Sequence, residues 1–260
     1  MIGIIGGSGL YQVDGVTIRE QRTIRTPFGD PSDSYLIGDF SGDEVVFLPR
    51  HGSNHAVPPH KINYRANIWG FKELGVERII SVGATGGIDA VMAPGTIVVL
   101  DQIIDLTHGR QTTFYDGENG VVHIDFTDPY CPEVRHAIIE AGNKADMSLI
   151  KSGTYVCTNG PRLETRAEIE FYSQIGATVV GMTGMPEAAL AREAEICYAG
   201  IAVVTNYAAG ITEKKLTSAE VIETMNRTSL QLKVLLRESF GLIPKGRNCS
   251  CKTALRDARI

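Results

Sequence analysis

Three segments of the chain contain residue types that suit the binding of an anion. They are Gly6-Gly7-Ser8-Gly9, Arg50-His51 and Thr183, which lie beside apolar stretches or before a helical pattern. Glycines let backbone N–H groups approach an anion closely, an arginine can fork onto phosphate oxygens, and a histidine adds a hydrogen bond and partial positive charge. The alternatives are a tight turn, a surface ion pair with a structural histidine, and a plain helix cap. Three such segments together favour a phosphate site.

Two polar residues elsewhere suit a planar heterocycle. Asn206 follows the apolar run 201–205, and its amide can donate and accept hydrogen bonds in one plane. Glu164 opens a helical pattern, and a carboxylate there accepts an N–H from a base. The alternative for Glu164 is a favourable charge in the first turn of a helix. Candidates for an apolar floor, each more often a core residue when taken alone, are Met182, Tyr207 and Phe114-Tyr115.

The elements that must position these residues follow from the hydrophobic pattern. Strand-like runs alternate with helical patterns, which predicts an α/β fold with a largely parallel sheet. The expected strands cover residues 2–5, 44–48, 78–82, 96–100, 154–157, 178–180 and 201–204, and the expected helices cover 61–74, 131–145, 162–175, 186–194 and 218–240. Ligands of such sheets bind at the carboxyl ends of the strands, where the polar candidates lie.

Composition narrows the class of protein. The chain has 260 residues, of which 43% are hydrophobic, and no linker-like stretch divides it, so one domain is expected. A net charge of −5 argues against nucleic acid or an anionic membrane as a partner. The N-terminal residues lack a basic region and a cleavage site, and no apolar run approaches the roughly 20 residues that span a bilayer. A cytoplasmic protein is therefore expected.

The five cysteines do not suggest a disulfide framework, but Cys249-Ser250-Cys251 is a close pair near the C-terminus. Reduced thiols, a local disulfide and metal binding all stay open for this pair. Metal ranks last because two sulfurs make only half a zinc site. His108 and His123 have no partner at ligand spacing, so no metal is expected. A Walker A loop, a strict dinucleotide glycine spacing and a serine-hydrolase elbow are also missing.

An ordered series of motifs resembles the trimeric purine nucleoside phosphorylases, in the branch that contains methylthioadenosine phosphorylase. The resemblance runs from Gly3 to about Leu235. Its motifs are Gly3–Leu10, Arg50–Gly52, Asn63–Trp69, Asp101–Asp105, Phe114–Gly117, Gly160–Arg162 and Gly181–Glu187 with Cys197–Ala199. It implies one domain over residues 1–260, with a mixed central sheet flanked by helices and a tail from about 245 to 260. It also implies a homotrimer or homohexamer.

Carried over by position, the resemblance implies roles for individual residues. The phosphate site would comprise Ser8, Arg50, His51, Gly83, Ala84 and Thr183. Met182 would lie under the ribose, and the base-binding segment would comprise Asn206, Tyr207 and Ala208. Ala219 would line the 5′ pocket, and His123 would reach the 5′ pocket of a neighbouring subunit. Asn206, Glu164 and His51 would carry the catalysis.

Two departures from the branch bear on the substrate. The enzymes of this branch that prefer 6-aminopurines carry aspartate at the position of Asn206, and usually a second aspartate at the position of Ala208. They carry a small hydroxyl residue at the position of Glu164. The residues present resemble the inosine and guanosine phosphorylases instead. Physically, asparagine can donate to a 6-carbonyl, whereas aspartate would leave it unpaired at a cost of about 1–3 kcal/mol. Glu164 would accept the ring N–H that adenine lacks.

The expected activity is therefore phosphorolysis of inosine and guanosine to the free base and ribose 1-phosphate in purine salvage, with phosphate as co-substrate and no cofactor. Phosphorolysis of S-methyl-5′-thioinosine is the alternative, and that of S-methyl-5′-thioadenosine is less favoured. Rival classes are a nucleoside hydrolase, a non-catalytic nucleoside-binding regulatory module and a Rossmann dehydrogenase. The glycine spacing disfavours the last of these.

Overall fold

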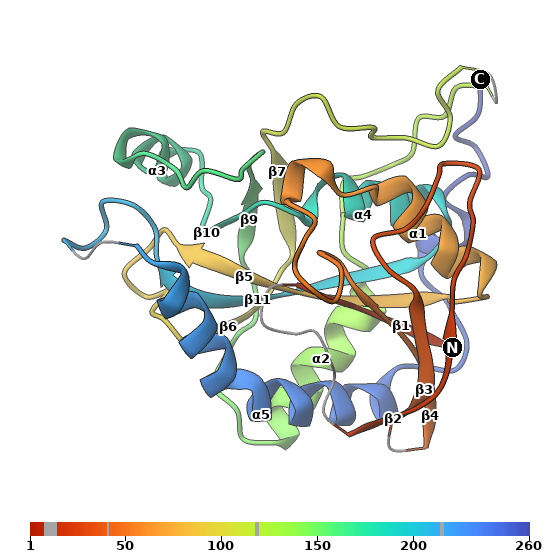
Figure 1. Cartoon of the computed structure of the whole chain (residues 1–260), viewed down its shortest axis with the longest axis horizontal. Coiled ribbons are helices and arrows are strands. Elements are labelled where there is room, and N and C mark those ends of the chain that lie inside the picture. Colours follow the sequence, from red (N-terminus) through yellow and green to blue (C-terminus); the bar gives the residue numbers. More distant parts are fainter. Residues whose placement is uncertain (8–14, 41, 118–119, 214–215) are drawn as a thin grey trace.

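The computed structural model describes residues 1–7, 15–40, 42–117, 120–213 and 216–260. Figure 1 shows the arrangement of the elements around a long, twisted sheet. The strands are β1 (Ile2–Gly6), β2 (Val16–Arg22), β3 (Tyr35–Phe40), β4 (Asp43–Pro49), β5 (Arg78–Gly87), β6 (Ile97–Val99), β7 (Gln102–Asp105), β8 (Leu149–Ile150), β9 (Thr154–Cys157), β10 (Val179–Gly181) and β11 (Cys197–Tyr207). The helices are η1 (Pro59–Lys61), α1 (Tyr64–Glu73), α2 (Pro132–Lys144), α3 (Arg166–Gln174), α4 (Gly184–Glu193), α5 (Ser218–Leu242) and η2 (Ser250–Thr253).

Strand β5 is the centre of the sheet. It pairs in parallel with β1 and β11, and its last residues, Gly86 and Gly87, pair antiparallel with β10. One arm of the sheet continues through β4, β3 and β2, and another through β10, β9 and β7. The pairs β2–β3, β3–β4, β5–β10 and β6–β11 are antiparallel, so the sheet is mixed. This confirms the mixed sheet that the family resemblance implied.

Helices cover both faces of the sheet. Helices α1 and α4 lie on one side, and α2 and α5 lie on the other (Figure 1). Each side has its own buried apolar cluster: Phe71 and Leu190 belong to the first, and Ile138 and Leu236 belong to the second. A two-sided core of this kind holds the carboxyl ends of the central strands in place.

The expected strands and helices are all present, with ends shifted by a few residues. The largest shift is at β5, which continues to Gly87, and α3 begins four residues later than expected because Thr165 caps it and Arg166 is its first residue. The sequence pattern missed β2, β3, β7 and β8; of these, β2 is largely exposed and β8 has only two residues, so each carries a weak hydrophobic signal. None of the helices described is long and apolar enough to cross a membrane.

Candidate functional site

A cavity of about 560 Å³ opens where β1, β4, β5, β10 and β11 end. This is the edge of the sheet that the sequence pattern pointed to. Seven of the predicted site residues line the cavity together with Gly83 and Ala84: Arg50, His51, Glu164, Met182, Thr183, Asn206 and Ala208. A cavity of this size suits a small organic ligand.

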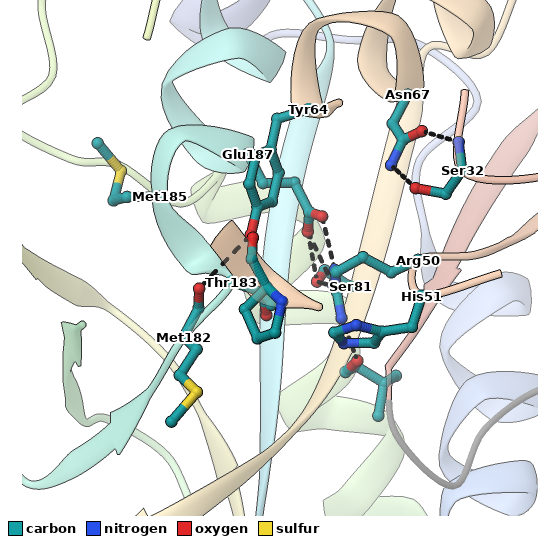
Figure 2. A network of polar contacts seen from close by, with 12 residues as sticks. Ser32, Arg50, His51, Tyr64, Asn67, Ser81, Met182, Thr183, Met185 and Glu187 are labelled. Carbon is teal, nitrogen blue, oxygen red and sulfur yellow. Dashed lines mark hydrogen bonds and ion pairs between the residues drawn. The ribbon is translucent and has the colours of Figure 1, made fainter. Parts of the chain in front are cut away.

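Arg50 is fixed by a buried ion pair at the floor of this region (Figure 2). Its Nε and Nη2 donate to the two carboxylate oxygens of Glu187 at 2.7 and 2.9 Å. Ser81 and Tyr198 also donate to Glu187, at 2.9 and 2.7 Å. Arg50 and Glu187 are 1% and 0% exposed, so water does not screen their attraction. The carboxylate therefore accepts four hydrogen bonds in the interior.

The ion pair that was the alternative interpretation of Arg50 is present, but it is buried instead of lying on the surface. The Nε and Nη2 edge of the guanidinium binds Glu187, so a phosphate cannot use that edge. Nη1 donates to the Val82 carbonyl at 3.3 Å and lies next to Gly7, and both Arg50 and Gly7 line the cavity. Burial lowers the pKa of Arg50, but the charge and hydrogen bonds of Glu187 outweigh it and raise that pKa.

Sequence reasoning missed the partners of Arg50. Glu187 entered the sequence analysis only as the last residue of the Gly181–Glu187 motif, and it lies in the first turn of α4. Its pairing with Arg50 spans 137 positions, and that with Ser81 spans 106. A signal was present: an acidic residue between apolar positions of a buried helix needs a buried partner.

His51 differs from the expectation in its charge. Its Nδ1 lies 2.8 Å from the Val57 carbonyl oxygen, and because a carbonyl only accepts, Nδ1 carries the proton. Burial, and then the positive charge of Arg50, lower the pKa of His51 to about 4. The ring is therefore neutral near pH 7, with Nε2 left as an acceptor. It can contribute a hydrogen bond, whereas the partial positive charge expected of it is absent.

Thr183 does not act as the helix cap that was its alternative interpretation. It is the N-cap residue of α4, yet its side chain makes no capping hydrogen bond, and its backbone N–H donates to the Tyr155 hydroxyl at 3.1 Å. The side chain is thus available to the cavity, which it lines. Ser8, the remaining predicted phosphate ligand, lies outside the described residues.

A β-bulge directs Asn206 into the cavity. Val204 pairs with Thr85 and Asn206 pairs with Gly86, so Thr205 is an extra residue on β11. A bulge of this kind re-aims the side chains that follow it. The Asn206 amide donates to the Tyr207 carbonyl at 2.9 Å and accepts from the Thr205 hydroxyl at 2.9 Å. Among the described residues these are its partners, which leaves one N–H and one lone pair for a ligand.

Glu164 lies just before α3 and not in its first turn. The first-turn charge that was its alternative role belongs to Glu168, which forms a capping box with Thr165. Glu164 lines the cavity, and its Oε1 accepts from the Thr158 hydroxyl at 2.8 Å. Burial raises the pKa of Glu164, partly offset by that hydrogen bond. Its carboxylate retains acceptor sites for a ligand N–H.

Five other candidates, including Tyr115, lie away from the lining of this cavity. The Tyr207 hydroxyl donates to the Ala90 carbonyl at 3.3 Å, and Ala219 is exposed on α5. Phe114 packs in the core against Phe28 and Trp69, so it forms no floor for a ligand. His123 is exposed, and its backbone N–H donates to the Ala258 carbonyl at 2.8 Å. The apolar lining that sequence reasoning missed includes Leu163, Leu216, Val221, Val180 and Pro59.

The sequence profile of the phosphorylase superfamily matches residues 1–240 of the chain. A probable 6-oxopurine nucleoside phosphorylase from Thermococcus kodakarensis is 52% identical over 99% of this chain and 98% of its own length. A probable S-methyl-5′-thioinosine phosphorylase from Thermodesulfovibrio yellowstonii is 54% identical over 99% of this chain and 96% of its own length. An S-methyl-5′-thioadenosine phosphorylase from Thermofilum pendens is 48% identical over 100% of this chain and 98% of its own length.

Solved structures have the same fold. The methylthioadenosine phosphorylase of Schistosoma mansoni in complex with adenine superposes with a TM-score of 0.94 at 33% identity, covering 99% of this chain and 98% of that one. A methylthioadenosine phosphorylase from an antarctic soil metagenomic library has a TM-score of 0.91 at 39% identity, and the match covers 100% of this chain and 92% of that one.

Proposed function

This chain belongs to the phosphorylase superfamily, and we propose that it cleaves 6-oxopurine nucleosides such as inosine and guanosine with inorganic phosphate. The products are the free base and ribose 1-phosphate. One observation carries the proposal: Asn206 and Glu164 line the same cavity as Arg50, His51 and Thr183. A purine-recognising pair and a set of anion-binding groups therefore share one solvent-accessible space.

The pair Asn206 and Glu164 suits a keto purine better than an amino purine. The remaining N–H of the Asn206 amide donates to the 6-carbonyl, and its remaining lone pair accepts from a protonated N7. Glu164 accepts the N1–H beside the carbonyl. Adenine presents an unprotonated N1 and an amino group at these positions, so each contact would place like groups together. An unpaired polar group costs about 1–3 kcal/mol at such a site.

At the other end of the cavity, the phosphate is held by several groups of moderate strength. The Thr183 hydroxyl and backbone N–H groups around Gly83 and Ala84 donate to its oxygens, and Arg50 adds a buried positive charge. Neutral His51 accepts the O–H of monohydrogen phosphate at Nε2. Ser8 is included as a further phosphate ligand because the family resemblance implies that role.

Catalysis follows from placing these ends on opposite sides of a ribose over Met182. As the glycosidic bond breaks, positive charge develops at the anomeric carbon, and the bound phosphate stabilises it before adding there. The bonding electrons leave with the base, whose negative charge is neutralised when N7 takes a proton from solvent water, and the Asn206 oxygen then accepts a hydrogen bond from N7–H. Positioning and electrostatics supply the rate enhancement, without a covalent enzyme intermediate.

A second candidate substrate is S-methyl-5′-thioinosine. Leu216 and Val221 give the cavity an apolar wall near the start of α5, which suits a methylthio group. The relative at 54% identity is named for that activity. Both nucleosides carry the same base, so the contacts of Asn206 and Glu164 serve either one.

Steady-state kinetics test the proposal. The purified enzyme is assayed with inosine, guanosine, adenosine, S-methyl-5′-thioinosine and S-methyl-5′-thioadenosine, each with and without phosphate. We expect phosphate-dependent release of hypoxanthine and guanine, with kcat/KM for adenosine lower by about 5- to 150-fold for each polar group left unpaired. Base release without phosphate would identify a hydrolase, and binding without base release would identify a regulatory module. Faster cleavage of both adenine nucleosides would overturn the 6-oxopurine assignment.

The proposal extends to assembly and location. We propose a homotrimer or homohexamer, supported by the family resemblance and by exposed apolar side chains of Leu163, Phe171 and Ile175 around α3. The five free cysteines suit a reducing cytoplasm. Phosphate serves as co-substrate, and the proposed chemistry uses no cofactor.

A further inference from the structure

Four of the five cysteines meet at one point on the side of the sheet covered by α2 and α5. Cys131 precedes α2, Cys197 begins β11, and Cys249 and Cys251 flank the start of η2 near the C-terminus. Their Sγ atoms all lie within 4.8 Å of one another, and those of Cys197 and Cys249 are 3.4 Å apart. Cys249 and Cys251 supply only two of the four sulfurs of a metal site, and Cys131 and Cys197, which are distant in the sequence, supply the other two.

The arrangement has the dimensions of a metal-thiolate centre. A zinc ion with Zn–S bonds of about 2.3 Å holds four sulfurs about 3.8 Å apart at the corners of a tetrahedron. All four cysteines are free thiols and are at most 8% exposed, so the site is closed to solvent. A structural zinc site has these features, since a catalytic one keeps an open position.

The start of α2 favours a thiolate. Cys131 occupies the N-cap position of that helix, where the helix dipole favours negative charge. Binding of Zn²⁺ would release four thiol protons and leave a complex of net charge −2, which the α2 dipole partly offsets.

We propose that Cys131, Cys197, Cys249 and Cys251 form a structural tetrathiolate site for Zn²⁺. The site fastens the C-terminal segment to the body of the protein. Hydrogen bonds also attach that segment, such as those from Arg78 to the carbonyls of residues 244–246 and from Arg247 to the Glu195 carbonyl. None of the four cysteines lines the nucleoside cavity, so the metal takes no part in phosphorolysis.

The test measures metal content and sulfur chemistry in the full-length protein. The enzyme is produced in medium supplemented with zinc and purified with a reductant and no chelator. Elemental analysis should give about one zinc ion per chain, and X-ray absorption should show four sulfur neighbours at about 2.3 Å. The C249S/C251S double variant should lose the zinc. The matched control, Cys157→Ala, removes the buried thiol outside the cluster and should retain it.

Three results would overturn the proposal. One is metal-free wild-type protein that shows five free thiols after denaturation. Another is wild-type protein whose cluster cysteines are joined in disulfides despite the reductant. The third is zinc that persists in the double variant or is bound through nitrogen or oxygen. The wild-type measurements stand by themselves if the double variant fails to fold.

Discussion

At the level of single residues, the proposed specificity for the base depends on Asn206. Its carbonyl and amide groups are already half occupied by Thr205 and Tyr207, which fixes the direction of the remaining N–H. Asn206→Asp replaces that donor with a charged acceptor, which opposes a 6-carbonyl and favours a 6-amino group. We expect the ratio of kcat/KM for inosine to that for adenosine to fall by about 5- to 150-fold, the cost of one unpaired polar group. An unchanged ratio would show that Asn206 does not contact the base.

The depressed pKa of His51 makes a prediction about stability. A histidine in the unfolded chain titrates near pH 6.5, whereas folded His51 titrates near 4. Between these values the unfolded chain binds a proton that the folded one does not, so stability falls as the pH falls through that window and then levels off. The loss attributable to His51 is up to about 3 kcal/mol.

Urea denaturation of the wild type and of His51→Gln, between about pH 4 and 7.5, measures this effect. The variant should show a shallower loss of unfolding free energy with acidification. Parallel pH profiles for the two proteins would mean that His51 is protonated alike in both states.

At the level of elements, the Arg50–Glu187 pair joins the end of β4 to α4, with Ser81 of β5 bonded to both residues. Glu187→Gln leaves the Arg50 charge buried without its counter-ion, which costs about 3–5 kcal/mol. The control is Glu168→Gln, which weakens the ion pair with Arg162, whose side chain is 67% exposed, and should cost about 1 kcal/mol or less. Denaturant midpoints compare the two, and equal losses would contradict a buried, unscreened pair.

Helix α3 positions Glu164 through its first turn. The Thr165 hydroxyl accepts a hydrogen bond from the Glu168 backbone N–H, and the Thr165 backbone N–H donates to the Glu168 carboxylate. This cap directly follows Glu164, the predicted base ligand. Thr165→Ala should lower the unfolding free energy by about 1 kcal/mol and raise KM for inosine more than it lowers kcat. An unchanged KM alongside the lower stability would show that Glu164 is held independently of the cap.

At the level of the whole molecule, the proposed trimer or hexamer can be tested by measuring its mass in solution. Sedimentation velocity should give a particle of three or six times the mass of one chain. His123 lies away from the cavity of its own chain, so His123→Ala should lower kcat/KM only if that residue reaches a neighbour's site. A monomer with full activity would contradict the assembly.

Much of the fold and part of the site could be predicted from the sequence. Runs such as 2–5 and 201–204 are apolar along their length, and the helical pattern expected over 218–240 matches α5. The strand and helix patterns are local signals, because hydrophobic periodicity depends on residues within one or two turns. The rule that ligands bind at strand ends then selected Arg50, Thr183 and Asn206 for the cavity.

Contacts between distant residues were decided only by the tertiary structure. The sequence by itself determined the order of the strands and helices and the residue types at the strand ends. It did not determine that Glu187 holds the fork of Arg50, that the extra residue Thr205 turns Asn206 inward, or that Cys131 and Cys197 join Cys249 and Cys251. Each of these depends on which chain segments pack together, and packing is a property of the complete core, which local pattern does not encode.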